Sequence, residues 1–188
     1  MSLRMRMALL QPKKISKPAP VMLVAGVLAQ TPALADAAEA ALEREFGSMS
    51  RRSPDVPFDY TDYYEPEMGP KLTRRWVAFA RLIEPDRLAA AKLATNRLEL
   101  EFTEEGRRKV NLDPGLLSLH SLVLATTKDF AHRIYLGDGI FAEVTLLFES
   151  GEFRALPWTY PDYKSATCLE FLVQCREQML KTRTANPK

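Results

Sequence analysis

The chain lacks most of the features that would assign a function directly. It has only two cysteines and two histidines in 188 residues, which excludes a histidine-rich metal site. It contains no phosphate-binding P-loop, no G-x-G-x-x-G turn after a predicted strand and no G-x-S-x-G nucleophile elbow. These absences exclude P-loop NTPases, Rossmann dinucleotide-binding enzymes and serine hydrolases of the elbow type.

The chain also has little net charge. It carries 26 basic and 24 acidic side chains, a formal charge of +2, and this balance does not predict binding to nucleic acid or anionic lipid. Nucleic-acid binding through the basic start of the chain is therefore the weakest hypothesis, because the rest of the chain is slightly acidic.

Long apolar runs are missing too, so no transmembrane segment is predicted. The apolar run 21–29 follows a basic segment and resembles a secretory signal. However, prolines interrupt the charged segment and the run leads directly into an amphipathic helix, so we favour a buried first strand. Cys168 and Cys175 lie seven residues apart on a predicted helix, too far for a disulfide, and are expected to be small buried hydrophobes. This usage suits a reducing compartment, and we predict a cytoplasmic protein.

Length and pattern predict one α+β domain over residues 19–183, between a flexible basic tail (1–18) and a short C-terminal tail (184–188). The first half orders as β-α-β-β-α-β, the ferredoxin-like pattern, and the second half as antiparallel hairpins and a closing helix. The predicted first-half elements are a strand at 21–29, a helix at 33–46 capped by Thr31, a loop at 48–57, strands from 58 and at 72–83, a helix from 85 to 95 and a strand at 97–103. The second half is predicted as a turn at 113–115, a strand at 121–127, a hairpin over 132–149, a further strand at 152–158 and a helix at 167–182 with a Thr167/Glu170 capping box.

The stretch Phe58–Gly69, "FDYTDYYEPEMG", concentrates carboxylates and phenols without any basic residue. Glu65 and Glu67 flank a proline that fixes the local backbone. Together with Asp113 they are our candidate ligands for Mg²⁺, which prefers carboxylates, water and phosphate oxygens. Tyr63 and Tyr64 are candidates to stack on a base or to hydrogen-bond a phosphate. The alternative is a solvated loop whose tyrosines pack on the body of the protein.

Basic side chains that could hold an anion come from elsewhere in the chain. Lys128, His132 and Arg133 lie within six residues at the end of a predicted strand. Lys92 and Asn96 lie one turn apart on the second predicted helix and are further candidates for ligand binding. The alternative for all of these residues is ordinary surface charge, with His132 closing a turn.

Two more features could contribute to a site. Glu143 lies in the middle of a predicted strand between apolar neighbours, where a buried carboxylate with a raised pKa could act as an acid or base alongside His132. It could equally lie on a wet face or be buried in an ion pair. The aromatic loop "WTYPDY" offers Trp158 and Asp162 as ligand contacts, although such loops also use aromatics simply to pack.

Five strings share their order and spacing with one known family: "DYTDYYEPEMG", "KLATNRLE", "VNLDPG", "LVLATTKDFAHRIYLGDGIFAEVTL" and "WTYPDY". With these strings the chain resembles the uncharacterised bacterial family called domain of unknown function 4416, over about residues 21–176. The resemblance implies that residues 21–29 form the first strand of the domain. Some relatives carry an automatic label of GTP-binding protein, which no motif of this chain supports.

These observations leave three functional hypotheses. The leading one is a metal-assisted enzyme or ligand-binding domain for a phosphorylated or nucleotide-like small molecule. Carboxylates would hold Mg²⁺, the Lys128–Arg133 segment would hold the anion, and Glu143 would be the acid or base. The second is a non-catalytic protein-interaction module that uses the tyrosine-rich loops, and the third is binding of GTP without a P-loop.

Overall fold

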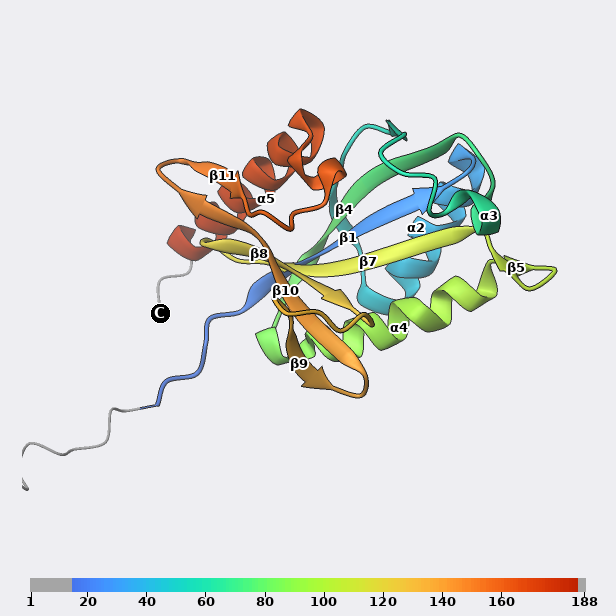
Figure 1. The fold of residues 1–188 in the computed structure, drawn as a ribbon. Coiled ribbons are helices and arrows are strands. Elements are labelled where there is room, and N and C mark those ends of the chain that lie inside the picture. Colours follow the sequence, from blue (N-terminus) through green and yellow to red (C-terminus); the bar gives the residue numbers. More distant parts are fainter. Residues whose placement is uncertain (1–14, 186–188) are drawn as a thin grey trace, which may run out of the picture.

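One large antiparallel sheet forms the centre of the molecule in the computed structural model, which describes residues 15–185 (Figure 1). Within these residues the sheet has nine strands, and the main path orders them β11-β10-β8-β7-β1-β4-β2. Two short strands lie off this path, β3 beside β4 and β9 beside β10. The strands are β1 (Val21–Ala29), β2 (Met49–Arg52), β3 (Val56–Phe58), β4 (Leu72–Ile83), β7 (Val110–Leu117), β8 (Ser121–Thr126), β9 (Ile134–Gly137), β10 (Ile140–Glu149) and β11 (Glu152–Ala155).

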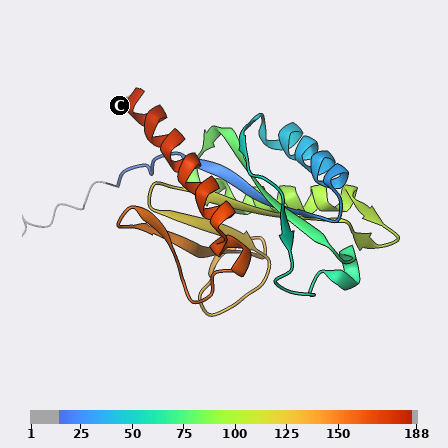
Figure 2. The ribbon, with the colours of Figure 1, turned by 90° about the horizontal axis from the view of Figure 1, so that it is seen from above.

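Helices cover both faces of this sheet. Residues of α2 and α4 join one apolar core, and residues of α5 join a second core on the opposite face (Figures 1 and 2). Within the described part of the chain the helical elements are α2 (Pro32–Phe46), α3 (Glu65–Met68), η1 (Pro85–Arg87), α4 (Leu88–Glu101), η2 (Pro161–Lys164) and α5 (Ala166–Ala185). A separate small hairpin joins β5 (Thr103–Glu104) to β6 (Arg107–Arg108).

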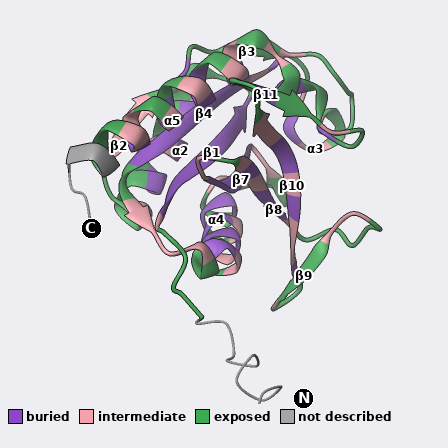
Figure 3. Ribbon diagram, turned by 90° about the vertical axis from the view of Figure 1, so that its left-hand side faces the viewer, coloured by how far each residue is buried: buried purple, intermediate pink, exposed green. Residues whose placement is uncertain are grey.

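The two-sided burial of β1 explains its continuous apolar sequence. All nine residues of the strand are buried (Figure 3). Every second side chain from Val21 to Ala29 joins the core under α2 and α4, whereas Met22 and Val24 join the core under α5 and Leu28 joins a small cluster with Met68 and Leu72. The prediction for 21–29 is confirmed, as are the strand at 72–83 and the first helix. Thr31 caps that helix by accepting a hydrogen bond from the backbone N–H of Leu34, at 3.2 Å.

The predicted α+β class and ferredoxin-like first half are confirmed. The four strands β7-β1-β4-β2 lie in that order, all antiparallel, with α2 and α4 as the two connecting helices. Two of these strands lie elsewhere in the sequence than predicted. The second strand of the motif is β2, inside the segment expected to be a loop, and the fourth is β7.

The strand predicted at 97–103 is wrong, because α4 continues to Glu101. Leu98, Leu100 and Phe102 alternate with polar residues, but so short an alternation does not distinguish a strand from one face of a helix. In the helix Leu98 is buried, Leu100 is 69% exposed and Glu99 points inward. The buried stripe of α4 has helical spacing from Leu88 onward.

The turn predicted at 113–115 is also wrong, because Asp113, Pro114 and Gly115 lie inside β7. Pairing of β7 with β8 begins only at Gly115. The proline therefore stands where one edge of β7 has no partner strand, the position at which a residue without an N–H is tolerated.

The remaining predictions for the second half hold with shifted ends. The strands β8 and β11 and the β9–β10 hairpin are present. The closing helix begins at Ala166, and Ser165 rather than Thr167 accepts the capping hydrogen bond, from the N–H of Cys168. Cys168 and Cys175 are free and buried on this helix, as predicted.

Most of the predicted N-terminal tail (1–14) and the last residues of the C-terminal tail (186–188) lie outside the described residues. Across residues 15–185, no helix combines the length and apolar character needed to cross a membrane.

Candidate functional site

Three loops that are far apart in the sequence meet on the face of the sheet that carries α5. The Nζ of Lys128 lies 3.2 Å from the hydroxyl of Tyr63, and Nη2 of Arg133 donates to the hydroxyl of Tyr160 at 2.9 Å. These contacts join the 58–69 stretch and the "WTYPDY" loop to the segment before β9. The polar loops singled out in the sequence therefore converge.

Glu143 forms the centre of this region. Its side chain projects from β10 and is 2% exposed. Its cross-strand partner is Leu124, which belongs to the core under α5, so Glu143 faces that side of the sheet. The same carboxylate oxygen, Oε2, lies 2.9 Å from Nε2 of His132 and 2.9 Å from Nε of Arg133. Of the alternatives left open for Glu143, the structure shows the buried, paired one.

Trp158 fixes the imidazole of His132 from one side. The two rings stack with centroids 4.7 Å apart and planes inclined by 13°. The indole N–H of Trp158 donates to the carbonyl of Val144 at 2.8 Å, which anchors the ring on β10. Among the described residues no hydrogen bond reaches Nδ1 of His132. The imidazole is therefore oriented through one nitrogen only.

Arg133 uses three of its five N–H donors to hold its neighbours. Its guanidinium donates to Glu143, to the carbonyl of Lys128 and to the hydroxyl of Tyr160, each at 2.9 Å. Burial, followed by the nearby Glu143 carboxylate, raises the pKa of Tyr160, so the phenol stays protonated at neutral pH. We call these five residues the His132 cluster: His132, Glu143, Arg133, Trp158 and Tyr160.

A second polar group, the Arg74 network, lies on the same face, beside the His132 cluster. Arg74 projects from β4, is 3% exposed, and forms ion pairs with Asp113 at 3.1 Å and with Asp162 at 3.0 Å. Asp113 also accepts a hydrogen bond from Asn111 at 2.7 Å, and Nζ of Lys92 lies 3.7 Å from it. The network consists of Arg74, Asp113, Asp162, Asn111, Lys92 and the buried Tyr163.

The two carboxylates that share Arg74 have opposite pKa shifts. Burial alone would raise the pKa of Asp113, but Lys92 and Arg74 outweigh it and hold this pKa below its usual value. For Asp162 burial dominates and raises the pKa, and the charge of Asp113 adds to the rise. Burial alone would lower the pKa of Arg74, but the charges of Asp162 and Asp113 outweigh it and raise this pKa.

Gly26 on β1 makes room for this network. A Cβ at this position would lie 2.7 Å from the hydroxyl of Tyr163 and 2.9 Å from Nη1 of Arg74. Such distances are not compatible with an unshifted side chain. An alanine at this position would therefore force the phenol or the guanidinium to shift.

Lys92 has a structural role in the fold. The N-terminal part of β7 has no strand partner on the side of β8, and α4 supplies side chains in its place. Lys92 donates to the carbonyl of Leu112 at 2.9 Å, and Glu99 accepts from the N–H of the same residue at 2.7 Å. Asn96 lies on the same helix and is half-buried.

The three candidate metal ligands are engaged differently. Glu67 accepts hydrogen bonds from both Nε and Nη2 of Arg108, and this pairing lowers the pKa of the carboxyl. Asp113 belongs to the Arg74 network. Within residues 15–185, no group of three or more histidine, cysteine or acidic side chains could hold a metal ion. Magnesium binding by Glu65, Glu67 and Asp113 stays a prediction that this arrangement does not favour.

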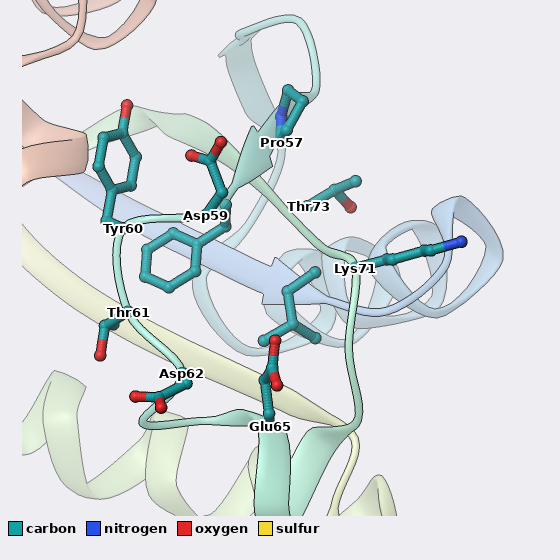
Figure 4. Close-up of a pocket in the computed structure, with 10 residues that line it drawn as sticks. Pro57, Asp59, Tyr60, Thr61, Asp62, Glu65, Lys71 and Thr73 are labelled. Carbon is teal, nitrogen blue, oxygen red and sulfur yellow. The ribbon is translucent and has the colours of Figure 1, made fainter.

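Glu65 lines a hollow with a cavity volume of about 630 Å³ between the 57–62 loop and the start of β4 (Figure 4). Asp59 and Asp62 line the same hollow, and Lys71 points away from Asp62 (Figure 4). Tyr64 turns inward, where burial raises its pKa above the usual range, while Tyr63 remains 60% exposed. The two tyrosines of the stretch therefore have different environments.

No sequence pattern had singled out Arg74 or Asn111, which the structure places in the Arg74 network. A signal for the first was present. Two consecutive arginines, Arg74 and Arg75, stand in a strand whose other residues are mostly apolar, so they point to opposite faces and each needs acidic partners. Arg75 finds them in Asp36, Glu39 and Asp55, on the α2 side.

Comparison with known families agrees with the resemblance seen in the sequence. A family model described as "Domain of unknown function (DUF4416)" matches residues 19–179. The chain belongs to this family. The match covers all of the strands and helices that build both polar clusters. No curated protein matches the chain.

Proposed function

We propose that the His132 cluster is the centre of a site that binds, and acts on, a phosphorylated or nucleotide-like small molecule. The observation that supports this most directly is the pairing of His132 with the buried Glu143, while the other imidazole nitrogen has no hydrogen-bond partner among the described residues. A histidine oriented by a carboxylate is the arrangement that general acid–base catalysis uses.

The role of each residue in the cluster follows from its contacts. Glu143 favours the tautomer with a proton on Nε2 of His132, which leaves a lone pair on Nδ1 to accept a proton from a ligand. Trp158 keeps the ring plane fixed by stacking. Arg133 forms an ion pair with the buried Glu143, with 2.9 Å between Nε and Oε2, so the carboxylate has a charged partner without a ligand.

The surroundings favour an anionic ligand that carries a planar ring. Lys128 is exposed, and its ammonium group lies 4.3 Å from the centre of the Tyr63 ring, so it can exchange this contact for a phosphate. The rings of Tyr63, Phe130 and Tyr160 are 60%, 64% and 41% exposed. Exposed aromatic faces near a cation provide stacking and charge for a nucleotide-like molecule.

Thermal unfolding of the purified protein against nucleotides, including GTP and ATP, and against sugar phosphates tests the proposal. A ligand at a hundred times its dissociation constant stabilises the folded state by about 2.7 kcal/mol, which raises the melting temperature by several degrees. Each ligand is added with and without Mg²⁺, which also tests the magnesium prediction.

His120 provides a matched control. It is the other histidine of the chain, and it is exposed in the turn at the far end of β8. His132→Gln should abolish the ligand-induced shift and His120→Gln should retain it. Equal shifts in the two variants would show that the ligand binds elsewhere.

A protein-interaction module is the second candidate, and β9 supplies the observation that favours it. Ile134, Tyr135 and Leu136 of this edge strand are 66%, 61% and 42% exposed (Figure 3). Exposed apolar residues on a sheet edge are typical of surfaces that take a partner. No stabilisation by any ligand of the panel, together with a partner whose capture is lost in Tyr135→Ser, would favour this second function.

A further inference from the structure

A second hollow lies on the other face of the sheet from the His132 cluster. It has a cavity volume of about 410 Å³, within the range of small-molecule sites, and lies between the end of α2, residues 87–97 of η1 and α4, and the last residues of β4. Its lining includes Leu23 and Phe79, which belong to the core under α2 and α4. It shares no lining residue with the hollow of Figure 4.

The floor of this hollow is apolar. Phe46 and Phe79 meet edge to face with ring centroids 5.4 Å apart, and Ile83 and Leu93 are partly buried beside them. Ala90, on α4, is exposed at the margin. A polar molecule such as a sugar phosphate would leave its hydroxyl groups without partners against such a floor.

The rim carries three arginines from three different elements. Arg81 comes from β4, Arg87 from η1 and Arg97 from α4, and all three are exposed. Arg97 has a weak ion pair with Glu45, with 3.9 Å between Nη2 and Oε1. Within residues 15–185, Arg81 and Arg87 have no ion-pair partner. The rim therefore has an excess of positive charge around an apolar floor.

We propose that this hollow binds an organic anion with an apolar tail, such as a straight-chain carboxylate. The guanidinium groups of Arg81 and Arg87 would hold the carboxylate, for which arginine has matching geometry, and the tail would lie on Phe46, Phe79 and Leu93. A molecule with the same tail and a neutral head group would contact only the apolar floor. A molecule with a cationic head group would be repelled by the arginines of the rim. The inference does not depend on the function proposed for the His132 cluster.

Calorimetric titration of the full chain with octanoate, octanol and octylamine tests this proposal, because the three probes share a tail and differ in head-group charge. Octanoate should bind, octanol should bind at least about tenfold more weakly, and octylamine should not bind. Decanoate should bind more tightly than octanoate, by about fourfold for each added methylene that is buried.

Variants place the binding in this hollow. The double substitution Arg81→Gln/Arg87→Gln should weaken octanoate binding by about tenfold or more and leave octanol unchanged. Ala90→Trp should abolish binding of both, because the indole fills the hollow from an exposed helix position. Arg154→Gln, in an exposed ion pair on β11, is the matched control and should bind octanoate like the unsubstituted chain.

Several outcomes would overturn the proposal. No binding of octanoate or decanoate by the folded chain would do so, and so would equally tight binding of octylamine. Unchanged octanoate affinity in either the double variant or Ala90→Trp, with unfolding midpoints like that of the unsubstituted chain, would place the binding elsewhere. None of these results affects the ligand panel proposed for His132.

Discussion

The Arg74 network and the His132 cluster lie on the same face of the sheet, but the aromatic residues that belong to them differ in exposure to water: Tyr163 of the network is 2% exposed. Arg74 and Asp162 are each 3% exposed, and their partners come from the sheet, from α4 and from η2. In the His132 cluster the charged side chains of Glu143 and Arg133 are also largely buried, with 2% and 9% exposed, but the aromatic side chains beside them are not. Tyr160 is 41% exposed and Trp158 is 37% exposed.

This difference in exposure suggests different roles for the two regions, one in the stability of the fold and the other in ligand binding. A buried charge is tolerated only when it is paired. Removing one partner therefore leaves an unpaired buried charge, which lowers the free energy of unfolding strongly. A partly exposed group can exchange its partner for a ligand at little cost. We therefore expect the Arg74 network to determine the stability of the fold and the His132 cluster to determine what it binds.

Removal of Arg74 should produce the largest effect. Arg74→Met keeps the apolar stem but leaves Asp113 and Asp162 without their arginine, and should destabilise the fold by about 3–5 kcal/mol. Urea unfolding measures this loss. Arg154→Met, which breaks an ion pair whose side chains are more than half exposed, should cost less than about 1 kcal/mol. A similar small loss for both variants would mean that burial does not distinguish them.

Gly26→Ala should have the next largest effect. The added methyl group meets the hydroxyl of Tyr163 and the guanidinium of Arg74, and overpacking of this kind costs about 1–3 kcal/mol. Tyr163→Phe should restore part of the loss, because it removes the nearer of the two atoms.

Gly26→Ala, Tyr163→Phe and the double variant form a double-mutant cycle that also tests the role of the Tyr163 hydroxyl. Among the described residues its buried hydroxyl has no hydrogen-bond partner, so Tyr163→Phe alone should be close to neutral in stability. Strictly additive effects of Gly26→Ala and Tyr163→Phe would contradict the contact between the two positions.

The two carboxylates of the network should respond to pH in opposite senses. The lowered pKa of Asp113 contributes stability above the unfolded-state pKa of about 3.9, and this stability is lost as the pH falls through its folded-state pKa. The raised pKa of Asp162 acts the other way. Its contribution is complete below about pH 3.9 and decreases as the pH rises through the folded-state pKa.

Carboxyl NMR titration of the folded protein measures both values. The resonance of Asp162 should titrate above the usual range of aspartate and that of Asp113 below it. The stability difference between the unsubstituted chain and Asp162→Asn should shrink as the pH rises from 4 towards neutral. A difference that grows over this range would reverse the assignment of the two carboxylates.

Several elements of the fold and most residues of the His132 cluster could be predicted from the sequence, because they depend on local patterns. The continuous apolar run 21–29 and the capped helix after it depend on neighbouring residues only. The hairpin of β9 and β10 was also visible from its turn. Lys128, His132, Arg133 and Glu143 were selected as chemically interesting, and they do meet.

The Arg74 network could not be predicted in the same way, because its members come together only through the order of the strands. Asp113 was expected in a turn, whereas β7 places it opposite Gly26 in the centre of the sheet. The segment 97–103 was expected to be a strand, whereas the helix α4 continues to Glu101 and lies along the unpaired edge of β7, where Lys92 donates to the carbonyl of Leu112. Both errors arose where a tertiary contact overrides a short local pattern.

The smallest effect on stability is expected for Lys128, at the exposed margin of the His132 cluster. Lys128→Gln removes a contact with the 60% exposed Tyr63, and should change the free energy of unfolding by less than about 0.5 kcal/mol. The same substitution should weaken binding of a phosphorylated ligand by about tenfold, because a charge-assisted hydrogen bond to phosphate is lost. Urea unfolding and titration with the best ligand of the panel measure the two quantities on one variant. A large loss of stability with unchanged affinity would place Lys128 among the residues that hold the fold, and the separation between the two regions would fail at its most exposed position.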